Sequence, residues 1–257
     1  MKLAGKTLLI TGASSGIGYE LAYQLARKGN RLVLVARRGN ELERLRQQLP
    51  EQEKNHLSFK CDVSDAGQVK DVCQQIIDAG IHLDVLLLNA GVSGGFQIKE
   101  IDLDTFRQQI ETNFFGAVYF VKNLVPHMIQ RKSGIIAVNG SLAGYRGMPN
   151  AAAYSAAKGA LMNFIDSIRI DLWTYKIQCT LISPGFVKTP MTDKNDYMMP
   201  FLMPVDKAAK IIIRGLEKGR TEIHFPYRLS VIAKISRLLP NRFYAWMMQG
   251  SRKRRRG

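Results

Sequence analysis

Short apolar segments alternate with segments of helical periodicity along most of the chain. After the first apolar run, hydrophobic side chains recur at helical spacing, at Ile17, Leu21 and Leu25. The pattern predicts strands at residues 6–11, 31–36, 57–63, 84–91, 134–140, 176–183 and 222–226. It predicts helices over residues 16–28, 41–49, 69–77 and 106–129, the second of which ends at Pro50.

Strands that are apolar along their whole length indicate a parallel sheet that helices cover on both faces. Right-handed crossovers then give an α/β domain with a Rossmann-like, doubly wound sheet of seven mostly parallel strands. Ligands of such a sheet bind at the carboxyl ends of the strands. We therefore expect a single domain over residues 1–224, with its site at that edge of the sheet.

The composition is that of a folded globular chain, with 46% hydrophobic and 23% charged residues among 257. Cys61, Cys73 and Cys179 have no metal-ligand spacing, and the four histidines are scattered, so we expect reduced thiols and no metal site. The first apolar run is too short for a signal peptide or a membrane span. These features favour a cytoplasmic protein.

The formal net charge of +16 is concentrated near the C-terminus. Residues 228–257 hold nine Lys or Arg and no Asp or Glu, which leaves +7 for the rest of the chain. Over residues 225–257, hydrophobic residues at helical spacing precede a cluster of aromatic residues and five cations at 252–256. This pattern predicts an amphipathic helical extension with a basic tail, and it is too interrupted by charge to span a bilayer.

Three roles stay open for this extension. It could lie on an anionic membrane surface, which would place the protein peripherally on the cytoplasmic face of a membrane. It could instead cover the substrate pocket or a subunit interface. Attraction to nucleic acid through the cation run is the least favoured of the three roles, because such runs bind nucleic acid without specificity.

The segment TGASSGIG, residues 11–18, joins the first expected strand to the first expected helix. Its glycines permit a sharp turn, and the free N–H groups at the start of the helix attract a phosphate. Arg37 and Arg38 follow the second strand, where a fold that prefers NAD usually has a carboxylate. Arg37 can bind a 2′-phosphate through charge-assisted hydrogen bonds. The sequence thus favours NADP(H) over NAD(H).

Tyr154 and Lys158 lie one helical turn apart in the segment NAAAYSAAKGA. A free tyrosine has a pKa of about 10, so proton transfer at neutral pH requires a lower value. The Lys158 ammonium group and a nearby oxidised nicotinamide would both stabilise the phenolate. Tyr154 is then a proton donor for ketone reduction and a base for alcohol oxidation, while Ser141 can donate a hydrogen bond to the carbonyl oxygen.

Several motifs, taken in order, resemble those of the short-chain dehydrogenase/reductase family. The resemblance extends from Lys6 to about Thr192. It rests on TGASSGIG, CDV at 61–63, LNAG at 88–91, TNFFG with Asn113, VNGSLAG with Ser141, YSAAK with Tyr154 and Lys158, and Pro184-Gly185. Leucine replaces the first asparagine of the family's NNAG. Gly140 replaces the first serine of its usual Ser-Ser pair, but Ser141 keeps the family's spacing of thirteen residues before the tyrosine.

The resemblance implies an NADP-dependent oxidoreductase that acts on CH–OH donors and transfers hydride between NADPH and a ketone or secondary alcohol. It implies a catalytic set of Asn113, Ser141, Tyr154 and Lys158, in which Lys158 also holds the nicotinamide ribose and Asn113 holds a water. The expected cofactor-binding residues are Thr11, Gly12, Ser14, Ser15, Gly16, Ile17, Gly18, Arg37, Arg38, Asp62, Val63, Asn89, Ala90, Gly91, Tyr154, Lys158, Pro184, Gly185, Val187 and Thr189.

The substrate side of the molecule has fewer constraints in the sequence. Residues 188–205, with three prolines and four methionines and no clear periodicity, are expected to form a mobile lid. With the extension, they favour a lipophilic substrate of the steroid, retinoid or keto-lipid kind that similar family members handle. The resemblance also implies a homodimer or homotetramer. The alternative is a catalytically idle NADP-binding protein that docks through its extension, and the complete catalytic set argues against it.

Overall fold

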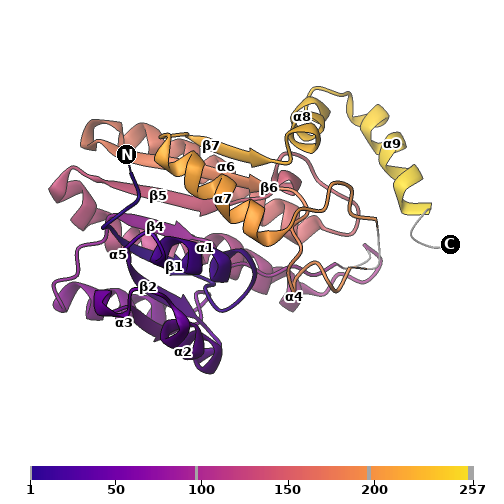
Figure 1. Cartoon of the computed structure of the whole chain (residues 1–257). Helices are drawn as coiled ribbons and strands as arrows, with labels where there is room; N and C mark the ends of the chain where they lie inside the picture. The colour runs from indigo at the N-terminus through magenta and orange to yellow at the C-terminus, as the bar shows by residue number, and fades with distance from the viewer. Residues whose placement is uncertain (1, 96–97, 196–197, 254–257) are drawn as a thin grey trace.

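In the computed structural model, which describes residues 2–95, 98–195 and 198–253, seven strands form one parallel sheet (Figure 1). Their order across the sheet is β3-β2-β1-β4-β5-β6-β7. Their bounds are β1 (Thr7–Thr11), β2 (Arg31–Ala36), β3 (Leu57–Lys60), β4 (Val85–Leu88), β5 (Gly134–Asn139), β6 (Ile177–Pro184) and β7 (Glu222–Phe225). The prediction of a doubly wound, seven-stranded parallel sheet is confirmed.

Helices cover both faces of the sheet, and the main ones alternate with the strands along the chain. The helices are α1 (Gly16–Ala26), α2 (Gly39–Gln48), α3 (Ala66–Asp78), α4 (Leu103–Ile110), α5 (Gly116–Arg131), α6 (Ala152–Asp171), α7 (Val205–Glu217), α8 (Tyr227–Ser236) and α9 (Asn241–Lys253). Shorter turns are η1 (Gln52–Lys54), η2 (Glu111–Phe115), η3 (Leu142–Gly144) and η4 (Trp173–Tyr175).

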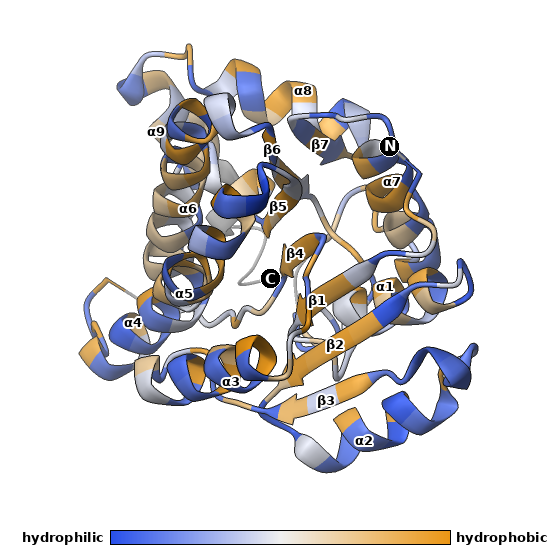
Figure 2. Ribbon diagram, turned by 90° about the vertical axis from the view of Figure 1, so that its left-hand side faces the viewer, coloured by the Kyte–Doolittle hydropathy of each residue, from blue (hydrophilic) through white to orange (hydrophobic). Residues whose placement is uncertain are grey.

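The strands alternate their side chains between two cores, because successive residues of a strand point to opposite faces. Leu8 and Ile10 of β1 belong to the cluster that packs against α1, α2 and α7. Leu9 belongs to the cluster formed with α3, α5 and α6. Figure 2 shows the hydrophobic residues gathered on the strands and on the helix faces turned toward them.

The sheet reverses its winding at β1, which pairs with β2 on one side and with β4 on the other. At such a switch point, the loops after the two neighbouring strands leave in opposite directions and open a crevice. The loop after β1 contains the glycine turn, and the loop after β4 contains residues 89–91. The order of the strands therefore places two of the expected cofactor motifs at the same crevice.

Two of the differences between predicted and observed element bounds affect the site. The single helix expected over 106–129 is divided, because the π-helical turn η2 separates α4 from α5. Single π turns inside helices occur frequently at functional sites, and this one contains Asn113. The third strand ends at Lys60, so Asp62 and Val63 lie in the turn that follows it.

The C-terminal residues form two helices that follow the last strand. Helix α8 packs through Leu229 and Ala233 against the core on the α6 side of the sheet. Helix α9 projects from the body of the molecule beyond α8 (Figure 1). Residues 254–257, which include most of the cation run, lie outside the described residues, as do residues 196 and 197 of the expected lid.

None of the helices described in this chain is both long and apolar enough to cross a membrane.

Candidate active site

The glycines of the turn between β1 and α1 lie where a side chain would not fit. Gly12 and Gly16 have φ angles of +67° and +58°, in the left-handed region that favours glycine. A Cβ atom on Gly12 would lie 2.8 Å from the Ala90 Cα, and one on Gly18 would lie 2.6 Å from the Asn89 Nδ2. The glycines thus allow the start of α1 to pack directly against the loop after β4.

The first N–H groups of α1 are free of a side-chain cap within the described structure. The N-cap residue is Ser15, and its hydroxyl makes no cap hydrogen bond. Arg38 donates to the Ser15 Oγ at 2.6 Å and to the Ser14 Oγ at 3.0 Å instead. Because uncapped N–H groups and the helix dipole attract anions, the start of α1 is suited to a phosphate.

The two arginines after β2 have different environments. Arg38 lies across the glycine turn through its bonds to the two serines. The Arg37 side chain is 48% exposed and forms an ion pair with Asp62 at 3.7 Å. The sequence predicts that Arg37 binds the 2′-phosphate. The structure brings Arg38 closer to the start of α1.

The carboxyl ends of β1, β4 and β5 are joined by a chain of polar side chains. The Thr11 Oγ1 accepts hydrogen bonds from the backbone N–H groups of Asn89 and Ala90, both at 3.0 Å. The Asn89 Nδ2 donates to the Thr11 carbonyl at 3.1 Å, and the Asn139 Nδ2 donates to the Asn89 Oδ1 at 2.9 Å. Asn139 was not predicted as a site residue, although its position at the end of an apolar strand was visible in the sequence.

Lys158 is buried directly behind this chain, with 3% of its surface exposed. Its Nζ donates to the Asn139 carbonyl oxygen at 2.6 Å. Burial lowers the pKa of Lys158 to about 8, because the charged form loses contact with water. The same Nζ lies 5.8 Å from the centre of the Tyr154 ring, so the structure brings the predicted pair together on α6.

Asn113, in the π turn η2, fixes the loop after β4. Its Oδ1 accepts from the Val92 N–H at 2.8 Å, and its Nδ2 donates to the Val92 carbonyl at 2.9 Å. A Cβ atom on Gly91 would lie 2.8 Å from the Asn113 Oδ1 and 3.5 Å from the Lys158 Nζ. The side-chain amide of Asn113 is thus engaged with the backbone, next to the ammonium group of Lys158.

Ser141 begins the turn η3, and its Oγ accepts from the Ala143 N–H at 3.1 Å. A hydroxyl group that accepts one hydrogen bond still has its own proton to donate. The turn rests on α6, because a Cβ atom on Gly144 would lie 2.9 Å from the Lys158 carbonyl carbon. Ser141 is therefore held on a turn that packs against the helix of Tyr154 and Lys158.

The segment after β6 lies over the glycine turn. A Cβ atom on Gly16 would be 3.2 Å from the Thr189 Cγ2, which places Thr189 across the crevice from the start of α1. Val187 is buried and pairs with Met203 in an isolated bridge. The Gly185 N–H donates to the Phe225 carbonyl at 2.7 Å. These contacts bring the segment from Pro184 to Thr189 to the edge of the crevice.

Arg146 joins the loop between Ser141 and Tyr154 to the C-terminal helices, and sequence reasoning missed it. Its guanidinium donates to the carbonyl oxygen of Ser236, to that of Leu239 at 2.9 Å and to the Asn241 Oδ1 at 2.9 Å. The guanidinium carbon also lies 4.0 Å from the centre of the Tyr244 ring. Because these partners are at least 90 residues away in the sequence, no local pattern could indicate them.

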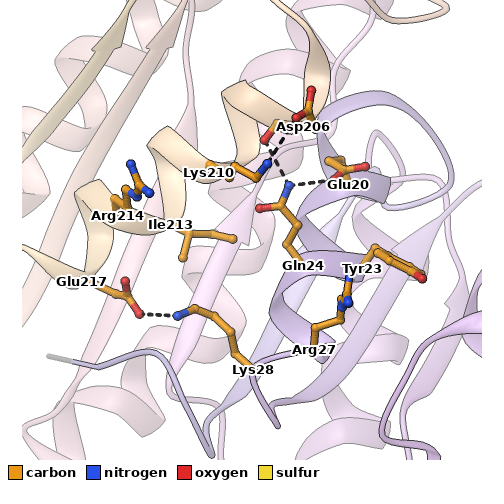
Figure 3. Close-up of a pocket in the computed structure, with 10 residues that line it drawn as sticks. All are labelled: Glu20, Tyr23, Gln24, Arg27, Lys28, Asp206, Lys210, Ile213, Arg214 and Glu217. Carbon is orange, nitrogen blue, oxygen red and sulfur yellow. Dashed lines mark hydrogen bonds and ion pairs between the residues drawn. The ribbon is translucent and has the colours of Figure 1, made fainter.

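A separate hollow of about 400 Å³ lies between α1 and α7 (Figure 3). Its charged side chains largely pair with one another, as Lys28 does with Glu217 at 3.0 Å and Lys210 with Asp206 at 3.4 Å. It contains none of the predicted site residues. Within the parts of the chain that the structure describes, no group of His, Cys, Asp and Glu could hold a metal ion.

Comparisons with known proteins agree with this geometry. The family model for short chain dehydrogenases matches residues 6–199. An uncharacterized oxidoreductase of Myxococcus xanthus (strain DK1622) is 36% identical over 240 residues, which cover 93% of this chain and 95% of that relative. An 11-beta-hydroxysteroid dehydrogenase of Pinus massoniana is 33% identical over 243 residues, which cover 87% of this chain and 68% of the relative.

Among solved structures, a short chain dehydrogenase/reductase from Burkholderia phymatum in complex with NAD has the same fold. Its TM-score is 0.83 at 22% sequence identity, and the match covers 91% of this chain and 93% of that one.

Proposed function

The chain belongs to the short-chain dehydrogenase family, and from this premise we propose that it interconverts a ketone and a secondary alcohol with NADP(H). The observation that carries the proposal is the buried Lys158 ammonium group, 5.8 Å from the Tyr154 ring at the edge of the nucleotide crevice. Burying a lysine costs free energy, and buried ionisable groups with a shifted pKa cluster at functional sites; here the group would stabilise a phenolate.

The crevice fits a dinucleotide. The uncapped start of α1 and the glycine turn would hold the pyrophosphate, because backbone N–H groups are available there and no side chain projects from the glycines. Asn139 Oδ1 is buried and has no hydrogen-bond partner among the described residues, so the inner end of the crevice still has an acceptor to satisfy. When bound, the nicotinamide would supply a hydride to the carbonyl carbon.

The protein's own part in the reaction is to move one proton and to stabilise charge. As negative charge develops on the carbonyl oxygen, Tyr154 would donate its phenolic proton to that oxygen, and Ser141 would donate a hydrogen bond to it. Lys158 would stabilise the phenolate that remains. In the direction of oxidation, the phenolate would accept the proton of the alcohol. Asn113 would act as a positioning residue by fixing the loop after β4, and the water-holding role implied by the resemblance stays a prediction.

The preference for NADP(H) rests on Arg38 and Arg37. The solved neighbour from Burkholderia phymatum holds NAD, so the fold alone does not select the cofactor. In this chain both residues after β2 are cations, and Arg38 already spans the serines of the glycine turn. A 2′-phosphate beside them would gain charge-assisted hydrogen bonds, which are worth about 1.5–3 kcal/mol each.

A lipophilic substrate is supported by exposed apolar side chains in the segment after β6, which reaches the edge of the crevice at Thr189. Met198, Phe201 and Leu202 of the segment after β6 have exposed fractions of 79%, 49% and 42%. The relative from Pinus massoniana carries the name of a steroid dehydrogenase. A carbonyl compound with a large apolar part would cover these side chains when it binds.

A homo-oligomer in a reducing, cytoplasmic compartment completes the proposal. Ile170 and Trp173, at the end of α6, are 77% and 76% exposed, which is unusual for large apolar side chains unless a partner covers them. The three cysteines are buried and unpaired, as expected where thiols stay reduced.

The test is a screen of the purified full chain against steroid ketones and long-chain aliphatic ketones, with NADPH and NADH in parallel. We expect oxidation of NADPH with at least one ketone, little oxidation of NADH, and loss of turnover in Tyr154→Phe. If no ketone gives turnover above that of Tyr154→Phe, the enzymatic proposal fails and the idle binding protein replaces it. If NADH is preferred, the assignment of Arg38 and Arg37 fails.

A further inference from the structure

Helices α8 and α9 present large apolar side chains to solvent. The exposed apolar side chains of the two helices and of the turn between them are here called the tail face. They are Tyr227, Ile232, Ile235, Leu238, Phe243, Trp246 and Met247. Leu238 is 84% exposed and Trp246 is 69% exposed. In α9 the positions 243, 246 and 247 follow helical spacing, so these three side chains share one face of the helix.

The tail face is turned outward because the opposite face is fixed to the body. Tyr244 donates from its hydroxyl to the Gly147 carbonyl at 2.8 Å, and its ring lies against the Arg146 guanidinium. On α8, Leu229 packs on the core, and Lys234 forms an ion pair with Glu222 at 2.6 Å. The tail is therefore attached through one side, and the apolar side chains on its other side remain uncovered.

Positive charge accompanies the apolar side chains. Arg228, Arg237 and Arg242 are exposed on or between the two helices. The sequence contains no acidic residue from position 228 onward, and it adds five cations at 252–256. Exposed aromatic and aliphatic side chains with cations and without acids are the pattern of helices that lie in the interface of an anionic membrane.

We propose that the tail face docks the protein on an anionic lipid membrane, with its apolar side chains inserted among the lipids and its cations at the headgroups. A second copy of the chain is a poorer occupant, because a symmetric interface would place these cations against one another. A nucleic acid is also poorer, because it could stack bases on the aromatic rings but would leave the aliphatic side chains of Ile232, Ile235 and Leu238 uncovered. Lipid satisfies both the charge and the aliphatic surface.

The docked orientation would bring the catalytic edge of the sheet toward the lipid. Helices α8 and α9 lie beyond the carboxyl ends of the strands, the edge that carries Tyr154 and Lys158 (Figure 1). Arg146 fixes them to the loop between Ser141 and Tyr154. A lipophilic ketone dissolved in the membrane would then have a short path to the crevice; this last step rests on the proposed function, whereas docking itself does not.

Flotation of the full chain with vesicles tests the proposal, and it needs no turnover. The vesicles are phosphatidylcholine alone, or phosphatidylcholine with about one third phosphatidylserine. We expect at least tenfold stronger binding to the anionic vesicles, and a loss of at least tenfold in the variant Phe243→Ser, Trp246→Ser, Met247→Ser. The triple variant Arg228→Gln, Arg237→Gln, Arg242→Gln should bind the anionic vesicles several-fold more weakly than the natural chain.

Matched controls carry equal changes elsewhere on the surface. Ile98→Ser with Leu103→Ser removes apolar side chains of comparable exposure, and the triple variant Lys70→Gln, Lys122→Gln, Lys176→Gln removes three exposed cations. Both should bind vesicles like the natural chain, and thermal unfolding should show that every variant is folded.

Three results would overturn the proposal. The first is equal binding to both kinds of vesicle, or no binding to either. The second is a tail-face variant that floats unchanged but sediments as a smaller oligomer, which would make the face a subunit interface. The third is binding to duplex DNA that is as strong as binding to the anionic vesicles and is insensitive to the serine substitutions.

Discussion

The catalytic cluster and the C-terminal tail place polar and apolar side chains in opposite environments. Lys158 and Asn113 are polar and almost completely buried, with 3% and 1% of their surfaces exposed. In the tail, Trp246 and Leu238 are apolar and largely exposed. Each arrangement costs free energy in the isolated chain, because it reverses the usual preference of the side chain for water or for the interior.

The two regions differ in the interactions that offset this free-energy cost. In the cluster, the buried groups satisfy one another through short hydrogen bonds, such as that from Lys158 to the Asn139 carbonyl at 2.6 Å. In the tail, the outer side chains keep large exposed fractions, and the membrane docking proposed above would cover them. Departures from local rules of this kind concentrate at functional sites.

The largest expected effect is on turnover in Lys158→Met, which keeps an unbranched side chain one atom shorter and removes its charge. Without the ammonium group the phenolate of Tyr154 loses its stabilisation, and we expect kcat to fall by about 10²–10⁴, the range for removal of acid–base catalysis. Steady-state rates of NADPH oxidation measure the change. Turnover within about threefold of the natural chain would show that the cluster is structural.

The same substitution also tests the burial of Lys158 in the absence of substrate. Burial lowers its pKa from 10.5 to about 8. Between these values the unfolded chain binds more protons than the folded one, so the contribution of Lys158 to the free energy of unfolding rises with pH. The rise is on the order of 3 kcal/mol over the whole window. Urea unfolding at pH values from neutral to alkaline should show this slope in the natural chain and a reduced slope in Lys158→Met.

A smaller effect is expected on cofactor binding in Arg38→Ala. Loss of charge-assisted hydrogen bonds to a 2′-phosphate should raise the KM for NADPH by about 10-fold to 100-fold. The KM for NADH should change little, because NADH has no such phosphate. Arg37→Ala is the matched comparison, and we expect a smaller rise because the ion pair with Asp62 holds this side chain at 3.7 Å. Equal rises for both cofactors in Arg38→Ala would contradict the assignment.

The smallest effect is expected in Arg146→Ala, which cuts the connection between the two regions. The tail loses hydrogen bonds worth about 1 kcal/mol each, so the KM for a hydrophobic ketone should rise by about threefold to tenfold. The kcat should stay unchanged, because Arg146 does not contact the reacting atoms. Faster amide hydrogen exchange in α9 would report the released helix. Arg242→Ala is the control, and an equal effect there would show that loss of charge alone is responsible.

The sequence predicted most of the framework, since apolar strands and helical periodicity are local patterns. The second strand has the predicted bounds, and all seven strands begin within one residue of the predicted start. The glycine turn and the Tyr154–Lys158 pair were also predicted, because both depend on neighbours within a few residues. The π turn at Asn113 was not, because its hydrogen bonds differ from those of an α-helix by a single position.

Contacts between distant segments explain what the sequence did not indicate. Asn139 is a site residue because it meets Asn89, which lies 50 residues earlier in the chain. Arg146 meets α8 and α9 only after the sheet has brought the end of the chain back to its middle. The choice of Arg38 over Arg37 for the glycine turn depends on side-chain directions at the end of β2, which hydrophobic periodicity does not determine.

In the proposed reaction, Tyr154 beside the buried Lys158 protonates a ketone that receives hydride from the bound cofactor. The most direct measurement uses NADPH labelled with deuterium at the transferable position and a ketone from the screen, with mass spectrometry of the product. We expect one deuterium on the carbinol carbon of the alcohol, and almost no labelled alcohol from Tyr154→Phe under the same conditions. Unlabelled alcohol, or equal amounts of labelled alcohol from both proteins, would contradict the proposed reaction.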